Sequence, residues 1–355
     1  MSKRVLSVVG ARPQFIKAFP VSAALADRHD EIIVHTGQHY DTCLSDVFFE
    51  ELAIPEPAYN LGVGSGTHAE QTAQMMMELD QVLDAESPDV VMVYGDTNST
   101  LAGALVAAKR SSALVHVEAG LRSNNRSMPE EHNRIATDHL ADVLIAPTTE
   151  AVETLESEDV DGAIHETGDV MYDALLRVRE RAASVSEIRS DLGVTEDEYV
   201  LATVHRAGNT ADRSRLRNII EGLAQSPLPV VVPLHPRTEA ALTEYGLYGA
   251  ATEQLQIVDP VGYLDFVHLL DGARLVATDS GGVQREAFHL DVPCVTMRDE
   301  TEWTKTIDCG WNTLVGADRD RIATAVAEMV PPRSKPQPYG NGNAANLVAE
   351  VITNA

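Results

Sequence analysis

Short runs of valine, isoleucine and leucine alternate with amphipathic segments along the chain, and this alternation constrains the fold more than any other feature. Such alternation is typical of βαβ units, in which parallel strands are covered by helices on both faces. The pattern therefore predicts an α/β protein with doubly wound sheets. The predicted strands are Val5–Gly10, Glu31–Thr36, Asp89–Tyr94, Ala113–Glu118, Val143–Pro147, Tyr199–Val204, Pro229–Pro233, Gln256–Val258, Leu275–Thr278 and Pro293–Met297.

Chain length and two pauses in the pattern predict the domain organisation. A chain of 355 residues exceeds the usual size of one hydrophobic core. The alternation pauses near Gly168 and Asp169, and again at the proline-rich stretch 331–336. We therefore predict an N-terminal Rossmann-like domain at 1–168, a C-terminal one at 169–340, and a final helix within 341–355 that returns to the first. Two such domains facing a central cleft would bind a ligand there.

The charge balance restricts the partners of the protein. Fifty-four acidic residues against 27 basic ones give a formal net charge of -27. So negative a surface argues against nucleic acid as a partner and suggests adaptation to high salt. The apolar runs are too short to span a bilayer, the N-terminus lacks a signal-peptide core, and three scattered cysteines suggest no disulfide framework. We expect a cytoplasmic protein without membrane insertion.

Carboxylates and arginines gather after two of the predicted strands. Asp96 follows one strand, and the tracts His116–Arg122 and Pro129–Arg134 follow the next. Strand ends are where α/β proteins bind ligands, so these acids are candidates for proton transfer and the arginines for phosphate binding. The alternative interpretation of the same residues is a solvated acidic loop.

Other strand ends carry groups suited to anions. Arg12 and Lys17 flank a predicted helix N-terminus, although the tract is not G-x-G-x-x-G and gives little support for a dinucleotide cofactor. His205 and His235 follow two strands of the second half, each beside an arginine, which favours a phosphate or proton-transfer role over a purely structural one.

The tract Thr278–Ala287 reads as a strand, a turn of small residues and a helix start. Ser280, Gly281 and Gly282 leave backbone N–H groups open to a diphosphate, and Glu286 lies at a spacing suited to a ribose diol. An ordinary helix cap with a tight turn is the alternative.

Taken together, these tracts resemble the non-hydrolysing UDP-N-acetylglucosamine 2-epimerases from the first strand to the final helix. The resemblance implies a GT-B type fold and the interconversion of UDP-N-acetylglucosamine and UDP-N-acetylmannosamine. It also implies that UDP is eliminated and added back through a 2-acetamidoglucal. The matching tracts are Gly10-Ala11-Arg12-Pro13, Gly95-Asp96-Thr97, His116–Arg122, Pro129-Glu130-Glu131, His205-Arg206 and Asp279-Ser280-Gly281-Gly282.

The resemblance assigns roles residue by residue. Asp96, Glu118 and Glu130 match the acidic cluster that moves the C2 proton, Arg134 matches its cationic partner, and His205 matches a histidine beside the departing diphosphate. It implies no cofactor and no metal, a UDP-sugar as the only small-molecule partner, and a homodimer. The expected substrate and UDP contacts are Arg12, Lys17, His39, Arg122, Arg206, His235, Phe266, Ser280, Gly281, Gly282, Glu286, Arg298 and Glu302.

Three departures from the family pattern leave the sugar open. Trp303 replaces an arginine of the usual Thr-Glu-Arg-Pro-Glu tract, the glutamate after His205-Arg206 is missing, and Asp41 and Ser65-Gly66 occupy activator-site positions. The same departures resemble a sister branch that epimerises UDP-2,3-diacetamido-2,3-dideoxy-glucuronate. A GT-B glycosyltransferase and a catalytically silent sugar-nucleotide sensor are further alternatives, but neither needs three carboxylates together.

Overall fold

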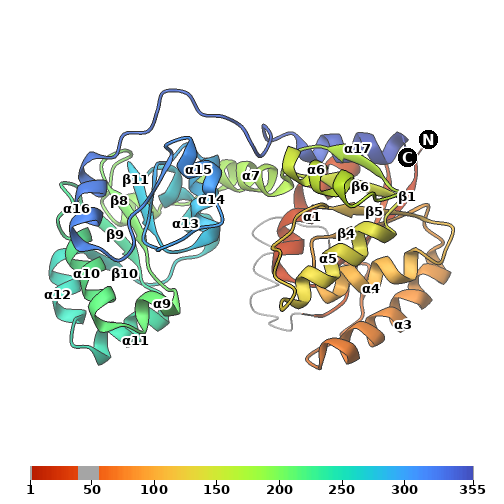
Figure 1. Ribbon diagram of the computed structural model, residues 1–355, viewed down its shortest axis with the longest axis horizontal. Coiled ribbons are helices and arrows are strands. Elements are labelled where there is room, and N and C mark those ends of the chain that lie inside the picture. Colours follow the sequence, from red (N-terminus) through yellow and green to blue (C-terminus); the bar gives the residue numbers. More distant parts are fainter. Residues whose placement is uncertain (1, 39–55, 355) are drawn as a thin grey trace. The chain divides into compact units, whose positions relative to one another are not determined.

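The computed structural model describes residues 2–38 and 56–354, so His39 and Asp41 lie outside the described residues. The chain forms two compact units, one made of Met1–Ala174 with Gln337–Ala355 and the other of Leu175–Pro336 (Figure 1). The first unit is therefore discontinuous in sequence, because its last helix follows the whole of the second unit.

A seven-stranded parallel sheet forms the centre of the first unit, in the order β3-β2-β1-β4-β5-β6-β7. The central strands are buried on both faces, which explains their continuous runs of valine, isoleucine and leucine. The strands are β1 (Arg4–Val9), β2 (Asp30–His35), β3 (Tyr59–Asn60), β4 (Val90–Tyr94), β5 (Ala113–Val117), β6 (Val143–Ala146) and β7 (Ala163–Glu166).

Helices connect these strands. From β1 the chain adds strands towards one edge of the sheet, and from β4 it adds strands towards the other edge. Right-handed crossovers on either side of such a reversal place α1 and α4 on opposite faces of the sheet. The helix α17 packs against α1, and the Asp173 carboxylate accepts the backbone N–H groups of Ala344 (3.1 Å) and Ala345 (2.9 Å) at its start. The helices are α1 (Arg12–Leu25), α3 (His68–Glu86), α4 (Asn98–Ala107), α5 (Pro129–Leu140), α6 (Thr149–Ser157) and α17 (Ala344–Asn354), and the chain enters the second unit within α7 (Val170–Val185).

The second unit repeats the architecture with a six-stranded parallel sheet in the order β10-β9-β8-β11-β12-β13. Its strands are β8 (Val200–Thr203), β9 (Val230–Pro233), β10 (Gln256–Val258), β11 (Leu275–Thr278), β12 (Cys294–Thr296) and β13 (Asn312–Leu314). Its helices are α8 (Ile188–Asp191), α9 (Ala207–Thr210), α10 (Arg213–Leu223), α11 (Pro236–Glu244), α12 (Tyr248–Gln254), α13 (Tyr263–Asp271), α14 (Gly281–His289), α15 (Thr304–Asp308) and α16 (Arg319–Glu328).

In each sheet, the connections from two neighbouring parallel strands lead to opposite sides of the strand order. These strands are β1 and β4 in the first unit and β8 and β11 in the second. Open α/β sheets bind ligands at the carboxyl ends of the strands at this point. In the first unit the turn after β1 is tight. A Cβ on Gly10 would collide with the hydroxyls of Thr36 and Ser99, which lie 2.8 Å apart, so only glycine fits there. The predicted site residues Arg12, Asp96, His205 and Ser280 follow β1, β4, β8 and β11 in turn.

Candidate active site

Two carboxylates, Asp96 and Glu118, follow the neighbouring strands β4 and β5. Glu118 has φ +73°, a left-handed conformation that is uncommon and costly for a residue with a side chain. Its carboxylate forms an ion pair with Lys17 of α1, and both side chains are almost buried. Gly95 lies against this pair, since a Cβ there would stand 3.1 Å from Lys17 Nζ. Lys17, predicted to bind UDP, therefore contacts an acid of the cluster.

Arg134 of α5 joins the acids on the other side. Its guanidinium pairs with Asp96 and lies 3.4 Å from the Glu131 carboxylate. Asn133 also fixes this turn by donating to the Asp96 carbonyl oxygen at 2.9 Å. Glu130, at the start of α5, is half-buried, and among the described residues no hydrogen bond or ion pair is found for its carboxylate. It is the acid of the cluster that is left open to a ligand.

Glu131, which the sequence analysis did not single out, holds the loop between β5 and α5. Its buried carboxylate accepts the backbone N–H groups of Ser123 and Asn124 and the Ser123 hydroxyl, each at 2.9 Å. Burial tends to raise the pKa of Glu131, but these hydrogen bonds together with Arg134 lower it below its usual value. An ionised Glu131 thus fixes the segment that leads to Glu130 and Arg134.

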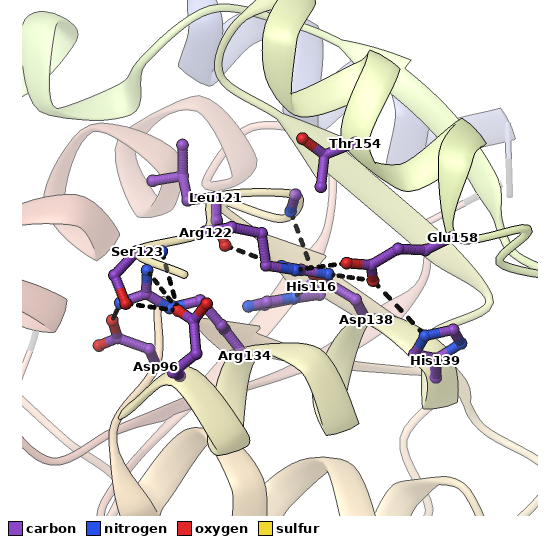
Figure 2. Close-up of polar contacts among 12 residues, drawn as sticks. Asp96, His116, Leu121, Arg122, Ser123, Arg134, Asp138, His139, Thr154 and Glu158 are labelled. Atoms are coloured by element: carbon purple, nitrogen blue, oxygen red, sulfur yellow. Dashed lines mark hydrogen bonds and ion pairs between the residues drawn. The ribbon is translucent and has the colours of Figure 1, made fainter. Parts of the chain in front are cut away.

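Arg122 occupies the middle of a buried ion network (Figure 2). Its guanidinium donates to Asp138 at 2.6 Å and makes two bonds to Glu158, at 2.9 and 2.7 Å. Asp138 in turn accepts from His116, with both side chains completely buried. Arg122 was expected to contact the substrate, but in the structure its guanidinium lies between two carboxylates of the protein.

The end of β1 is fixed by a residue that the sequence analysis also missed. The buried Gln14 side chain accepts from the backbone N–H groups of Gly10 (2.8 Å) and Ala11 (3.0 Å) and donates to the Tyr94 carbonyl oxygen at 2.8 Å. It therefore ties the start of α1, where Arg12 is the first helical residue, to the end of β4. The two strands at the switch point are held together immediately before Asp96.

In the second unit, the fully buried Asp279 organises the turn after β8. Its carboxylate accepts the backbone N–H groups of His205 (3.0 Å) and Arg206 (3.0 Å) and the side-chain amide of Asn209 (3.0 Å). The His205 ring thereby stands at the carboxyl end of β8, half-exposed, while the Arg206 side chain is exposed. Asp279 acts through the residues it holds, a role that its position in the Asp-Ser-Gly-Gly tract does not reveal.

His235 lies beside His205, with ring centroids 5.5 Å apart. Its Nδ1 also accepts the backbone N–H of Arg237 at 3.1 Å, which makes it the N-terminal cap of α11. Partial burial and the nearby charges of His205 and Arg237 lower the pKa of His235 below its usual value. His235 therefore has a structural role as a helix cap, with a mostly neutral ring. The cap uses Nδ1, so the predicted phosphate role falls to Nε2.

The tract after β11 forms the start of α14, as the sequence predicted. Ser280 is its N-cap and accepts from the Val283 N–H at 3.4 Å. A Cβ on Gly281 would collide with the Glu302 carboxylate, which Arg298 holds at 2.9 Å, while a Cβ on Gly282 would make only an ordinary contact with the Ser280 hydroxyl at 3.8 Å. The Glu286 carboxylate accepts from the Tyr263 hydroxyl at 2.9 Å, and Phe266 is half-buried on the same helix as Tyr263, α13.

In residues 2–38 and 56–354, no group of three or more His, Cys, Asp or Glu side chains is arranged to hold a metal ion. Over the same part of the chain, none of the helices is both long and apolar enough to cross a membrane.

Comparison with known proteins decides the family. A model of the family described as UDP-N-acetylglucosamine 2-epimerase matches residues 23–353. The chain belongs to this family. The protein is therefore a UDP-sugar 2-epimerase, an isomerase, as the resemblance of its motifs implied.

Relatives of this epimerase differ in the sugar that their names state. The UDP-2,3-diacetamido-2,3-dideoxy-D-glucuronate 2-epimerase of Pseudomonas aeruginosa is 47% identical over 98% of this chain and 99% of its own. The UDP-N-acetylglucosamine 2-epimerase of Methanocaldococcus jannaschii is 43% identical over 98% of both chains. A solved structure of UDP-N-acetylglucosamine 2-epimerase from the latter organism matches with a TM-score of 0.92 and 41% identity, covering 99% of this chain and 100% of that one. The predicted GT-B type fold is confirmed.

Proposed function

We propose that this epimerase interconverts UDP-N-acetylglucosamine and UDP-N-acetylmannosamine. A carboxylate of the Asp96, Glu118 and Glu130 cluster removes the proton from C2. The released electron pair forms the C1–C2 double bond while the C1–oxygen bond to UDP breaks, and UDP leaves with that bond's electrons. Return of a proton to the opposite face of C2, with UDP adding back to C1, inverts the centre.

The observation that carries this proposal is the set of carboxylates at the ends of β4 and β5 and the start of α5, with cations against two of them. A C2 proton is weakly acidic, so its removal needs a positioned base and, on the other face, a positioned acid. Lys17 beside Glu118 and Arg134 beside Asp96 orient these groups and balance their charge. Glu130, whose carboxylate has no partner among the described residues, supplies the third site for a proton.

Departure of UDP requires groups that accept negative charge on a diphosphate. We assign this role to His205 and to the start of α14, where Ser280, Gly281 and Gly282 present backbone N–H groups at the positive end of the helix dipole. Asp279 accepts the backbone N–H groups of His205 and Arg206, and these bonds fix the turn that carries the His205 ring. Glu286 takes the ribose diol in this proposal.

The neutral hexosamine is favoured over a uronate by the charges of the first unit. A uronate brings a carboxylate of its own and needs a cation to receive it. Three described cations near the acid cluster, Lys17, Arg122 and Arg134, are each paired with protein carboxylates. The Pseudomonas aeruginosa relative at 47% identity is the specific observation that favours the diacetamido-uronate as the second candidate.

The first prediction tests reaction and sugar together by proton NMR in D2O, with each candidate UDP-sugar in a separate tube. We expect the manno isomer and deuterium at C2 from UDP-N-acetylglucosamine, and much slower turnover of the diacetamido-uronate. Glu118→Gln should lower the rate by about 10²–10⁴-fold, because an amide cannot carry the proton, while UDP affinity stays unchanged. A Glu118→Gln enzyme with wild-type turnover would contradict the proposed mechanism, and faster turnover of the uronate would reverse the choice of sugar.

A further inference from the structure

One buried pair of side chains forms hydrogen bonds to both of the turns that carry Asp96 and Glu118. We propose that His116 and Asp138 are positioning residues that fix these two turns for proton transfer. His116 lies on β5, and its Nε2 is 2.7 Å from the Gly95 carbonyl oxygen while its Nδ1 is 2.6 Å from Asp138 Oδ1. The pair is completely buried, and neither residue touches the substrate in the proposed mechanism.

Both nitrogens of the His116 ring face oxygen atoms that accept hydrogen bonds. A carbonyl oxygen has no proton to give, so Nε2 donates to Gly95. The Asp138 carboxylate also pairs with the Arg122 guanidinium, which keeps it an acceptor, so Nδ1 donates to it. With both ring nitrogens donating, the ring needs the counter-charge that Asp138 supplies.

The second oxygen of Asp138 reaches the other turn. It accepts the backbone N–H of Gly120 at 3.2 Å and a guanidinium N–H of Arg122 at 2.6 Å. Glu118 and Gly120 both have positive φ, +73° and +82°, and the N–H groups of Glu118 and Ala119 bond the Ile145 carbonyl oxygen. A strained conformation at Glu118 persists only where its surroundings over-determine it, and Asp138 is one of the groups that do so.

One side-chain pair thus holds the residue before Asp96 and the residue two after Glu118. Proton transfer depends steeply on the placement of the reacting groups, and supporting side chains commonly set that placement to within about 0.5 Å. Loosening the pair should therefore slow chemistry without weakening the binding of the nucleotide. This inference rests on Asp96 and Glu118 acting on the C2 proton, as proposed above.

The test is Asp138→Asn, which keeps the shape of the side chain but removes its charge. We expect kcat to fall about 10–100-fold, by analogy with the residues that support metal ligands, with KM and UDP affinity unchanged. Glu158→Gln is the matched control, because it makes the same change at the outer, partly exposed end of the network and leaves the His116–Asp138 bond in place. Its kcat should equal that of the wild type.

A spectroscopic readout separates positioning from a loss of fold. Long-range proton–nitrogen correlation NMR should show protons on both ring nitrogens of His116 in the wild type, and on Nε2 alone in Asp138→Asn. Thermal unfolding shows whether Asp138→Asn is folded. If it is not, His116→Gln is the second variant, because its side-chain amide can still donate to the Gly95 carbonyl oxygen. The same loss of kcat at constant KM is expected.

Three results would overturn the inference: a wild-type ring with one proton, a folded Asp138→Asn or His116→Gln enzyme with wild-type kcat, or an equal loss of kcat in Glu158→Gln. An inactive Glu118→Gln beside a fully active Asp138→Asn would remove this inference alone. An active Glu118→Gln would instead remove the proposed function.

Discussion

At Glu118 the backbone adopts a conformation that glycine usually supplies. The residue nevertheless is a glutamate, and its carboxylate meets Lys17 while its flanking amides bond Ile145. The strain costs on the order of 1–3 kcal/mol and is offset by the buried network around the turn. Such a combination of strain and charge is expected where a side chain must point in one direction for function.

A second carboxyl of the first unit, Glu31 on β2, leads to a prediction about pH. Ser7 donates to it at 2.5 Å. Burial raises the pKa of Glu31, and the hydrogen bond from Ser7 only partly opposes this. Folding thus favours the protonated form, so the stabilisation is complete below the ordinary glutamate pKa of about 4.3 and is lost as pH rises through the raised folded value.

Glu31→Gln stays neutral at every pH. The unfolding free energy of this variant, minus that of the wild type, should therefore increase as pH is raised from about 4 to 8, the range in which the wild-type carboxyl ionises. Urea titrations across this range measure the difference. The exposed Glu153→Gln serves as control and should show a flat difference; a flat difference for Glu31→Gln as well would contradict the assignment.

From the sequence, the positions of the proposed acids along the chain could be inferred, but the residues that support them could not. Asp96, Glu118 and Ser280 stand where strand ends and a helix start were expected. Asp138 and Asp279 were missed as positioning groups, because their partners lie 22 and 74 residues away in the chain and only the folded sheet brings them together. Arg122 shows the same limit, since its two carboxylate partners follow it by 16 and 36 residues.

Among the elements, the central strands were predicted well, whereas three of the four edge strands were missed. The predicted strand Leu275–Thr278 coincides with the central strand β11, and Gln256–Val258 coincides with the one edge strand that was found, β10. The strands β3, β7 and β13 were missed, and each lies at an edge of its sheet. An edge strand has one neighbour and partly exposed side chains, so β7, with two exposed and two half-buried residues, has no apolar run to detect.

The start of α17 supports a prediction at the same scale. Asp173 of α7 accepts two N–H groups at the first turn of α17 and so acts as a cap supplied from a distant part of the chain. Asp173→Ala should lower the unfolding free energy of the first unit by about 1 kcal/mol, the usual cost of losing a cap. Thermal unfolding measures this, with Glu180→Ala, an exposed change on the same helix, as the control; equal effects of the two would disprove the capping role.

The whole molecule carries a net charge of -27, and this leads to the last prediction. Salt shortens the range of repulsion between surface carboxylates from about 30 Å at 0.01 M to about 10 Å at 0.1 M and 3 Å at 1 M. The melting temperature should therefore rise with potassium chloride at neutral pH. Near the isoelectric point of about 4.7 the net charge vanishes, and the salt dependence should vanish with it. A salt response of equal size at both pH values would refute the charge explanation.

The return of α17 to the first unit has a consequence for synthesis on the ribosome. Residues up to Ala174 emerge first, but the helix that covers α1 follows only after Leu175–Pro336 have been translated. At about 5–20 residues per second this interval lasts roughly 10–30 s. During that time the apolar surface of α1 that α17 later covers is exposed. The first unit is therefore translated before the second but completed after it. Chaperone binding to stalled chains that end before residue 337 should therefore exceed binding to the released protein.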